Sequence, residues 1–324
     1  MTTATVIGAG VAGLTTALEL NRSGFQVTVI DRAQGLGPQQ CSWWAGGMLA
    51  PWCERESAEE AVITLGTTAA NWWEEATGGV SRQGTLVVTP DRDRRELARF
   101  SRRTSNYVTL GEKEIAGLEP DLAGRFRDAL FFEEEAHLNP RNAVQDLFDH
   151  LSAQNVSVRF GTDEPPEADI TIDCRGLAAS DQLEDLRGVK GEMLLIRTSE
   201  INLTRPVRLL HPRHPIYIVP RGEGLFMLGA TMIESSDRTR ITARSMLELL
   251  GAAYALHPAF GEAEIVETGI DARPAFPDNL PRVIHRKDRI FVNGLYRHGF
   301  LLAPAMAAEA ARIARNHISL ERAS

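Results

Sequence analysis

Apolar and polar residues follow one another at the start of the chain in blocks that predict a strand, a helix and a second strand. Ala4 to Ile7 is a short apolar, β-branched run typical of a buried parallel strand. The next apolar residues recur with helical period, at Leu14, Ala17, Leu18 and Leu20. Gly24 ends that helix, and Phe25 to Ile30 predicts a second strand that finishes on Asp31.

Both periods continue along the rest of the chain. Strands are predicted at 86–89, 156–160 and 290–293 and through much of 190–268, and helices at 139–151 and 303–314. The helix at 139–151 begins with Asn139-Pro140, a capping residue followed by the proline that the first helical turn tolerates. This mixture of elements predicts an α/β fold.

Three glycines stand between the first strand and the first helix. Gly8, Gly10 and Gly13 have the G-x-G-x-x-G spacing, which permits a tight turn, a close approach to a pyrophosphate, and close helix–strand packing. The free N–H groups of the helix start favour phosphates. Asp31 then accepts hydrogen bonds from a ribose hydroxyl, and its negative charge counts against NADP. The unit predicts dinucleotide binding without separating FAD from NAD.

Composition narrows the class of protein. The 324 residues suggest about two domains, and a net charge of −8 argues against a nucleic-acid partner. The three cysteines, Cys41, Cys53 and Cys174, form no C-x-x-C pair and predict neither a disulfide framework nor a metal site. No basic-then-apolar leader and no membrane-length apolar run is present, so we expect a cytoplasmic protein with no membrane partner.

Six later blocks resemble, in order, motifs of the glycine oxidases and related D-amino-acid oxidases. They are Cys41–Pro51, Val189–Glu192 ("VKGE"), Tyr217–Arg221 ("YIVPR"), Gly229–Met232 ("GATM"), Gly269–Pro274 with Asp278 and Pro281, and Tyr296–Pro304. A single block is weak evidence, but the ordered set over nearly the whole chain is specific. The chain is most similar to the glycine oxidases of thiamine biosynthesis.

This resemblance implies two interleaved domains. A Rossmann-type FAD-binding domain would comprise residues 1–75, 136–188 and 269–324, and a mixed-sheet substrate-binding domain would comprise residues 76–135 and 189–268. The cofactor implied is non-covalent FAD. Family members often form homotetramers, so a homo-oligomer is expected.

The resemblance also assigns site residues. Arg273 would anchor a substrate carboxylate, because its planar fork matches a carboxylate bidentately. Tyr217 would bond the same carboxylate or wall the pocket, Arg297 would be a second anchor or a neighbour of the flavin, and Met232 would line the pocket or belong to the core. The expected cofactor contacts are Gly8, Gly10, Val11, Ala12, Gly13, Asp31, Arg32, Ser42, Ala45, Gly46, Gly47, Met48, Gly176, His298, Gly299, Phe300, Leu301 and Leu302.

His298 could serve as a general base, but a hydrogen-bonding or structural role is favoured. The expected activity is FAD-dependent oxidative deamination of a small amino acid. Glycine would give glyoxylate (or its imine), ammonia and hydrogen peroxide by hydride transfer from the α-carbon, with oxygen as acceptor. Three alternatives remain open: a dehydrogenase with another acceptor, an oxidase for sarcosine or a D-amino acid, and a non-catalytic flavin protein.

The sequence departs from the family pattern at three places. Trp43 and Trp44 stand where relatives carry small residues, so they could narrow the pocket or the path to the flavin. The segment 158–169 is short where relatives carry a strand pair near the adenine. Asp173-Cys174-Arg175-Gly176 replaces a family turn, which leaves the adenine contacts open.

Overall fold

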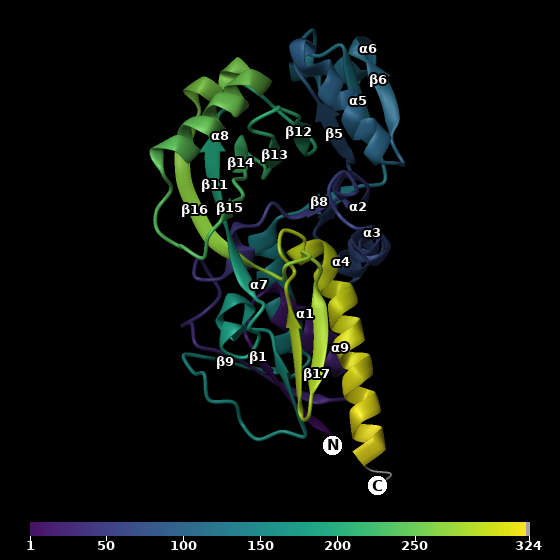
Figure 1. Ribbon diagram of the computed structural model, residues 1–324, viewed down its shortest axis with the longest axis vertical. Coiled ribbons are helices and arrows are strands. Elements are labelled where there is room, and N and C mark those ends of the chain that lie inside the picture. Colours follow the sequence, from purple (N-terminus) through teal and green to yellow (C-terminus); the bar gives the residue numbers. More distant parts are fainter. Residues whose placement is uncertain (322–324) are drawn as a thin grey trace.

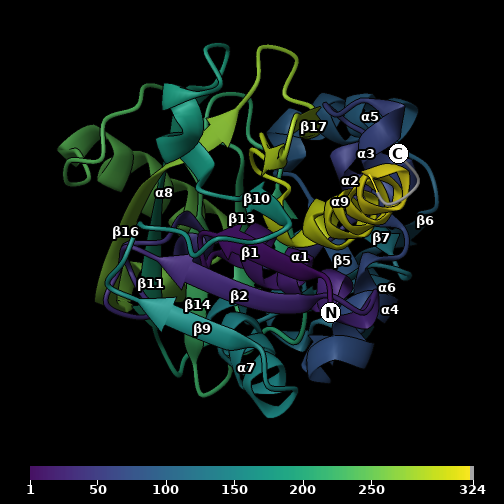
Figure 2. The same cartoon turned by 90° about the horizontal axis from the view of Figure 1, so that it is seen from below.

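The computed structural model describes residues 1–321 and is elongated, with a parallel sheet at one end and a larger mixed sheet at the other (Figure 1). The six-stranded sheet has the order β17-β18-β10-β1-β2-β9. Its strands are β1 Thr3–Ile7, β2 Gln26–Asp31, β9 Ser157–Phe160, β10 Ile170–Asp173, β17 Arg282–Arg286 and β18 Arg289–Asn293. All neighbours are parallel except β17 and β18. Figure 2 shows β1, β2 and β9 side by side.

Three long helices pack together against this sheet. They are α1 Val11–Arg22, α7 Pro140–Ala153 and α9 Gly299–Glu321. Helix α1 contacts both α7 and α9, and their apolar faces share one core with β1 and β2. The predicted start of α7 is confirmed, since Asn139 Oδ1 accepts the Arg141 N–H at 3.1 Å. Three shorter helices, α2 Pro51–Glu54, α3 Glu60–Gly66 and α4 Ala69–Thr77, follow the second strand in the chain.

Helix α9 begins four residues earlier than the small-residue pattern predicts. The Leu302 N–H bonds to the His298 carbonyl at 2.8 Å, so Gly299 to Leu302 form its first turn rather than a loop before it. Pro304 within the helix cannot donate to the Phe300 carbonyl four residues earlier. The buried Trp73 indole donates to that carbonyl instead, at 2.8 Å, which removes part of the cost of the proline.

The nine-stranded sheet has the order β15-β11-β14-β13-β12-β5-β7-β6, with β16 also paired to β11. Its strands are β5 Thr85–Val88, β6 Val108–Gly111, β7 Asp128–Phe132, β11 Arg187–Arg197, β12 Val207–Leu209, β13 Ile216–Pro220, β14 Leu225–Gly229, β15 Ile233–Glu234 and β16 Glu264–Ala275. Helices α5 Arg94–Arg103 and α6 Glu112–Leu118 contact β7. Helix α8 Ala243–Leu256, which the strand-rich pattern of 190–268 did not predict, contacts β13 and β14.

Two features tie these parts together. The small sheet β3 Met48–Leu49, β8 Ala136–Leu138 and β4 Val80–Ser81 joins segments that leave and return to the six-stranded sheet. Strands β11 and β16 pair along their whole length, from Arg187 opposite Ala275 to Arg197 opposite Glu264. They therefore run across both positions, 188/189 and 268/269, at which the sequence suggested a domain boundary. The observed mixed α/β architecture confirms the predicted fold class.

Candidate functional site

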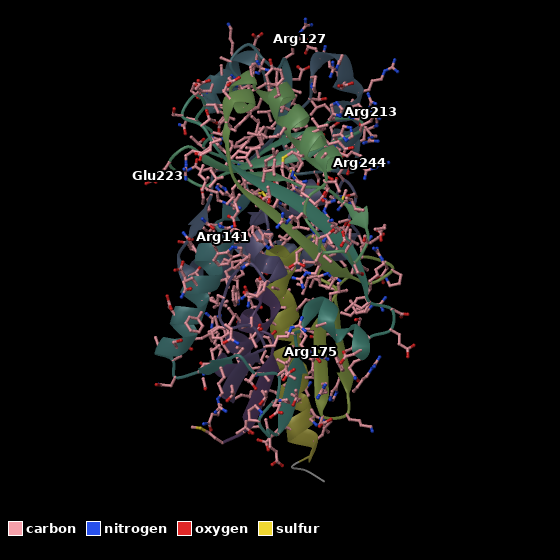
Figure 3. The ribbon with its side chains drawn as sticks, turned by 90° about the vertical axis from the view of Figure 1, so that its left-hand side faces the viewer. Arg127, Arg141, Arg175, Arg213, Glu223 and Arg244 are labelled. Carbon is pink, nitrogen blue, oxygen red and sulfur yellow. The ribbon has the colours of Figure 1, made fainter. Side chains whose placement is uncertain are left out.

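A cavity of about 660 Å³ lies between the two large sheets. One end lies at the turn between β1 and α1 and at the end of β2, and the other lies on β11, β13 and β16. The start of α9 and the 3-10 turn Cys41–Trp44 complete the walls. Arg175 also lines the cavity, and Figure 3 shows it beside the strands of the six-stranded sheet. Arg141 lies on α7 at the edge of the molecule in the same view.

The glycine-rich turn has the close approaches that its spacing predicts. Gly8 has φ +104°, and a Cβ there would lie 2.7 Å from the Cys174 carbonyl oxygen. A Cβ on Gly13 would collide with the Gly8 carbonyl, so Gly13 lets α1 pack on β1 and does not itself line the cavity. Gly10 has no side chain to cap α1, Ser42 Oγ accepts the Val11 N–H at 3.4 Å, and the first-turn residues Val11 and Ala12 line the cavity. A helix start that faces the cavity in this way fits a pyrophosphate.

Asp31 lies where β2 ends, on the cavity wall. Its Oδ2 accepts the Ala9 N–H at 2.7 Å and its Oδ1 accepts the Ala33 N–H at 2.8 Å. The carboxylate thus braces the glycine-rich turn, and each oxygen keeps a second lone pair for a ribose hydroxyl. The glycine-rich turn, the helix start that faces the cavity and this acidic residue together fit FAD at this end of the cavity.

The adenosine end differs from the family pattern around Asp173. That buried carboxylate pairs with Arg175 at 2.8 Å, and Arg175 also pairs with Asp181 at 2.9 Å. Arg175, Gly176 and Asp163 of the short 161–169 loop line the cavity. The Gly161 N–H bonds to the Ala33 carbonyl at 2.8 Å, so this loop closes directly on the end of β2. An ion-paired arginine and a short loop therefore stand near the expected adenine position.

Arg273 lies on the opposite wall, projecting from β16 over the neighbouring strand β11. A Cβ on Gly191 of β11 would collide with its guanidinium, so that glycine makes room for it. Its Nη1 donates to the Thr231 carbonyl at 3.1 Å, and no carboxylate of residues 1–321 forms an ion pair with it. The guanidinium keeps donors free toward the cavity.

Tyr217 stands beside it on β13. Its ring occupies the space above Gly229 and below Gly46, where a Cβ would come within 2.8 and 2.9 Å of it. Arg221, the residue that follows β13, is half-buried and donates to the Gly46 carbonyl at 2.8 Å and the Leu138 carbonyl at 3.0 Å. Arg221 thereby fixes the segment that covers Tyr217.

A buried ion cluster lies behind Arg297, and its centre, Glu54, was not among the residues that the sequence suggested. The Glu54 carboxylate accepts from Arg208, from Arg297 Nη2 at 2.7 Å and from His298 Nε2 at 2.9 Å. Although burial opposes it, the positive charges of Arg297 and Arg208 hold the pKa of Glu54 well below its usual range. We call these four residues the Glu54 cluster.

The Glu54 cluster changes the interpretation of two residues. Arg297 lines the cavity and donates to Glu54, which it shares with Arg208, and His298 is buried against Glu54 and does not line the cavity. Met232 does not line the cavity either: it is 54% exposed, and its sulfur lies 3.4 Å from Arg297 Nη1. The pocket position expected for Met232 is therefore not observed.

The remaining expected cofactor contacts divide into two groups. The cavity wall includes Arg32, Ser42, Ala45, Gly46, Gly299 and Phe300. Gly47, Met48, Leu301 and Leu302 lie outside it. Gly47 packs against the Leu138 carbonyl, and Leu301 packs against Gly66, so both hold neighbouring segments together.

The two tryptophans of the 3-10 turn have different surroundings. Trp44 lines the cavity, whereas Trp43 lines a separate small hollow with Arg141 and Arg221. Both rings stack on the Arg141 guanidinium, at 4.8 Å for Trp43 and 5.2 Å for Trp44. Of the pair, only Trp44 is in a position to shape the pocket.

A metal site and a membrane-spanning helix are two further features to consider within residues 1–321. No group of three or more His, Cys, Asp or Glu residues in this part of the chain has the arrangement of a metal site. No helix within the same residues is long and apolar enough to cross a membrane.

Comparisons with known proteins agree with this geometry. The family model described as DAO, FAD dependent oxidoreductase, matches residues 3–313. A Rhizobium etli protein named as a thiamine biosynthesis oxidoreductase, ThiO, is 61% identical over 310 residues, which cover 95% of this chain and 94% of that protein. Among solved structures, glycine oxidase from Bacillus cereus superimposes with a TM-score of 0.82 at 20% identity, covering 97% of each chain. Iminodiacetate oxidase from Chelativorans sp. superimposes with a TM-score of 0.80 at 24% identity, covering 97% of this chain and 95% of that one. The chain belongs to the DAO family of FAD-dependent oxidoreductases.

Proposed function

We propose that this enzyme oxidises the amine of a small amino acid, with glycine as its preferred substrate. The observation that carries the proposal is Arg273, a guanidinium on the cavity wall with no carboxylate partner among residues 1–321. Because this half-buried guanidinium lines the cavity without an ion-pair partner, its donors are available to an anion, and its planar fork matches a carboxylate. The name of the Bacillus cereus structure, glycine oxidase, supports an amino acid as the source of that carboxylate.

The charges on the wall favour a substrate with one carboxylate. Arg297 is paired with Glu54, and Arg238 is paired with Asp271 at 2.7 Å. Arg273 is then the guanidinium at this end of the described cavity that remains for the substrate. Tyr217 donates its hydroxyl to the same carboxylate in this proposal, so the α-carbon is held between Arg273 and the ring of Tyr217.

The reaction needs no side-chain base in this proposal. Asp271 is occupied by Arg238, and burial raises the pKa of the Cys41 thiol to about 12, so that this thiol stays protonated. The proposal therefore requires the ammonium group to lose its proton to solvent first, so that the amine is neutral when it reacts. Its nitrogen lone pair would form the C=N bond as a hydride leaves the α-carbon, and FAD, when bound, would supply the hydride acceptor, with oxygen as the final acceptor that yields hydrogen peroxide. Water then hydrolyses the imine to glyoxylate and ammonia.

The same chemistry is compatible with a place in thiamine biosynthesis, where the glycine imine itself would be the useful product. The name of the 61% identical Rhizobium etli protein supports this role. No residue of the described cavity distinguishes release of the imine from its hydrolysis, so the proposal covers both.

The direct test is to add glycine to the purified yellow protein in air and to follow peroxide. We expect bleaching of the flavin without oxygen and peroxide formation with it. A flavin that glycine reduces but that reacts slowly with oxygen would instead identify a dehydrogenase. A flavin that stays oxidised with glycine, sarcosine and D-amino acids would contradict the proposal.

A further inference from the structure

Three side chains stand around one small area of the nine-stranded sheet and bound the substrate end of the cavity. Tyr217, Trp44 and Arg273 all line the cavity, as do Met193 and Gly191 of β11 between them. Strand pairing fixes where each side chain stands, because Met193 is opposite Gly229 of β14 on one side and opposite Gly269 of β16 on the other. The distances between these side chains can therefore be estimated from the spacing of residues along and across the strands.

The glycines of this area mark the position of each boundary. A Cβ on Gly229 would lie 2.8 Å from the Tyr217 ring, and one on Gly191 would collide with the Arg273 guanidinium. A Cβ on Gly269 would collide with the Trp44 ring, with the Met193 sulfur 2.6 Å away. The tyrosine, the guanidinium and the indole therefore lie over Gly229, Gly191 and Gly269, with Met193 as the floor.

These positions leave little room beside the guanidinium. Gly191 is two residues along the sheet and one strand across from Gly269, so the guanidinium and the indole lie over points about 8 Å apart. A carboxylate oxygen lies about 2.8 Å from the guanidinium, the α-carbon about 2.4 Å beyond that oxygen, and apolar contact with the indole takes about 3.7 Å more. These lengths together fill the spacing, so an α-carbon bound there lies against the indole and a side chain on it has no room toward Trp44.

Trp44 is held in this place from three sides. Its Nε1–H donates to the Pro38 carbonyl at 2.8 Å, the Arg141 guanidinium lies 5.2 Å from the ring centroid, and Gly269 and Met193 lie beneath it. Swinging the ring away would break the hydrogen bond and uncover Met193. A larger substrate would therefore meet a fixed wall.

We propose that Trp44 is the specificity-determining residue of the site, limiting the substrate to amino acids with no more than a very small side chain. The inference rests on the proposed function for the identity of the substrate, but the steric claim concerns any carboxylate bound at Arg273. Family members with small residues in this segment would lack this wall, so the limit is a property of this chain's own sequence.

The neighbouring tryptophan provides the matched control. Trp43→Ala removes an indole from the same 3-10 turn and the same Arg141 stack, but from a residue that lines only the separate hollow. Trp44→Ala should raise kcat/KM for D-valine relative to glycine by about 10- to 100-fold. Trp43→Ala should leave that ratio within about twofold. Rates are followed with an artificial electron acceptor as well as by peroxide, so that the acceptor does not decide the result.

A binding experiment separates this inference from the proposed function. Acetate and benzoate are titrated into each FAD-loaded protein, and their dissociation constants are read from the change in the flavin spectrum. Trp44→Ala should improve benzoate affinity relative to acetate by at least about tenfold, whether or not any amino acid is oxidised. Trp44→Phe, which keeps one ring, should give a smaller gain and replaces Trp44→Ala if that variant does not fold. Unchanged ratios in a folded, FAD-loaded variant, or equal gains with Trp43→Ala, would overturn the inference.

Discussion

Arg273 and Arg297 lie on the same cavity wall and have opposite electrostatic surroundings. Arg297 donates to Glu54 at 2.7 Å within a cluster that also contains Arg208 and His298, whereas Arg273 bonds only to the Thr231 carbonyl. The ion-paired Arg297 therefore belongs to a closed structural unit, whereas the half-buried Arg273 keeps its donors available for a ligand in the cavity. Residue type alone does not distinguish the two roles; the location of the compensating carboxylate does.

The largest effect is expected from Arg273. Arg273→Ala should lower kcat/KM for glycine by about a thousandfold, because two charge-assisted hydrogen bonds worth about 4 kcal/mol are lost. The thermal unfolding midpoint should change little, since no ion pair of residues 1–321 is broken. The control is Arg213→Ala, an exposed arginine outside the cavity (Figure 3). A loss of less than tenfold for Arg273→Ala would remove the contrast between the two arginines.

For Glu54, the expected effect of a substitution is on stability, whereas for Arg273 it is on activity. Glu54→Gln leaves Arg208 and Arg297 without their carboxylate, so the free energy of unfolding should fall by about 3 kcal/mol. Urea unfolding measures the loss, and the control is Glu56→Gln, which removes only partly exposed pairings with Arg103 and Arg99. If the two variants were equally stable, the Glu54 cluster would not be the structural unit described above.

The smallest effect concerns Glu135, a buried carboxylate near Arg208 whose Oε1 accepts the Cys53 N–H at 2.6 Å. Burial raises its pKa to about 7, above the value of 4.5 that applies in the unfolded chain. A group with a raised folded pKa contributes its full stability below pH 4.5 and loses it as pH rises toward 7. Glu135→Gln, which stays neutral, should therefore gain on the wild type by about 2 to 3 kcal/mol between pH 4.5 and 7.5.

That measurement needs a comparison at each pH, because burial and the charge of Arg221 lower the pKa of the neighbouring strand residue His137 to about 4. The contribution of His137 to the free energy of unfolding has the opposite pH dependence to that of Glu135, because it is lost as pH falls from 6.5 toward 4. It is present in both proteins and cancels in the difference. The exposed variant Glu134→Gln should show no pH-dependent gain, and a constant difference for Glu135→Gln would contradict the raised pKa.

The parts of the molecule that the sequence predicted well are those with local patterns. The glycine-rich turn with β1, α1 and β2 lies within about thirty residues, and its geometry follows from glycine spacing and strand periodicity. The cap of α7 is local too. The start of α9 was placed too late because Gly299 and Pro304 weaken a helical pattern, and the Trp73 hydrogen bond that supports Phe300 comes from 227 residues away.

The candidate site was predictable only where a motif carried it. Arg273 and Tyr217 were found through resemblance, and the structure brings both to one wall. Glu54 was missed because its partners Arg208 and Arg297 are 154 and 243 residues distant, and no local pattern marks a carboxylate at the end of a four-residue helix. The recognised block ends at Pro51, three residues before Glu54. The available signal was therefore only that Glu54 is the first acidic residue after an apolar run.

The glycine at position 269 has a consequence for how this enzyme could change over generations. Even an alanine there would strike the Trp44 ring, so the substitution is closed to the present sequence. Once Trp44 has been replaced by a smaller residue, the remaining close contact is the flexible Met193 side chain, whose sulfur would lie 2.6 Å from the added Cβ and would have to shift. Position 44 therefore acts as a gatekeeper, because the route to a wider substrate range passes through it before β16 can diversify.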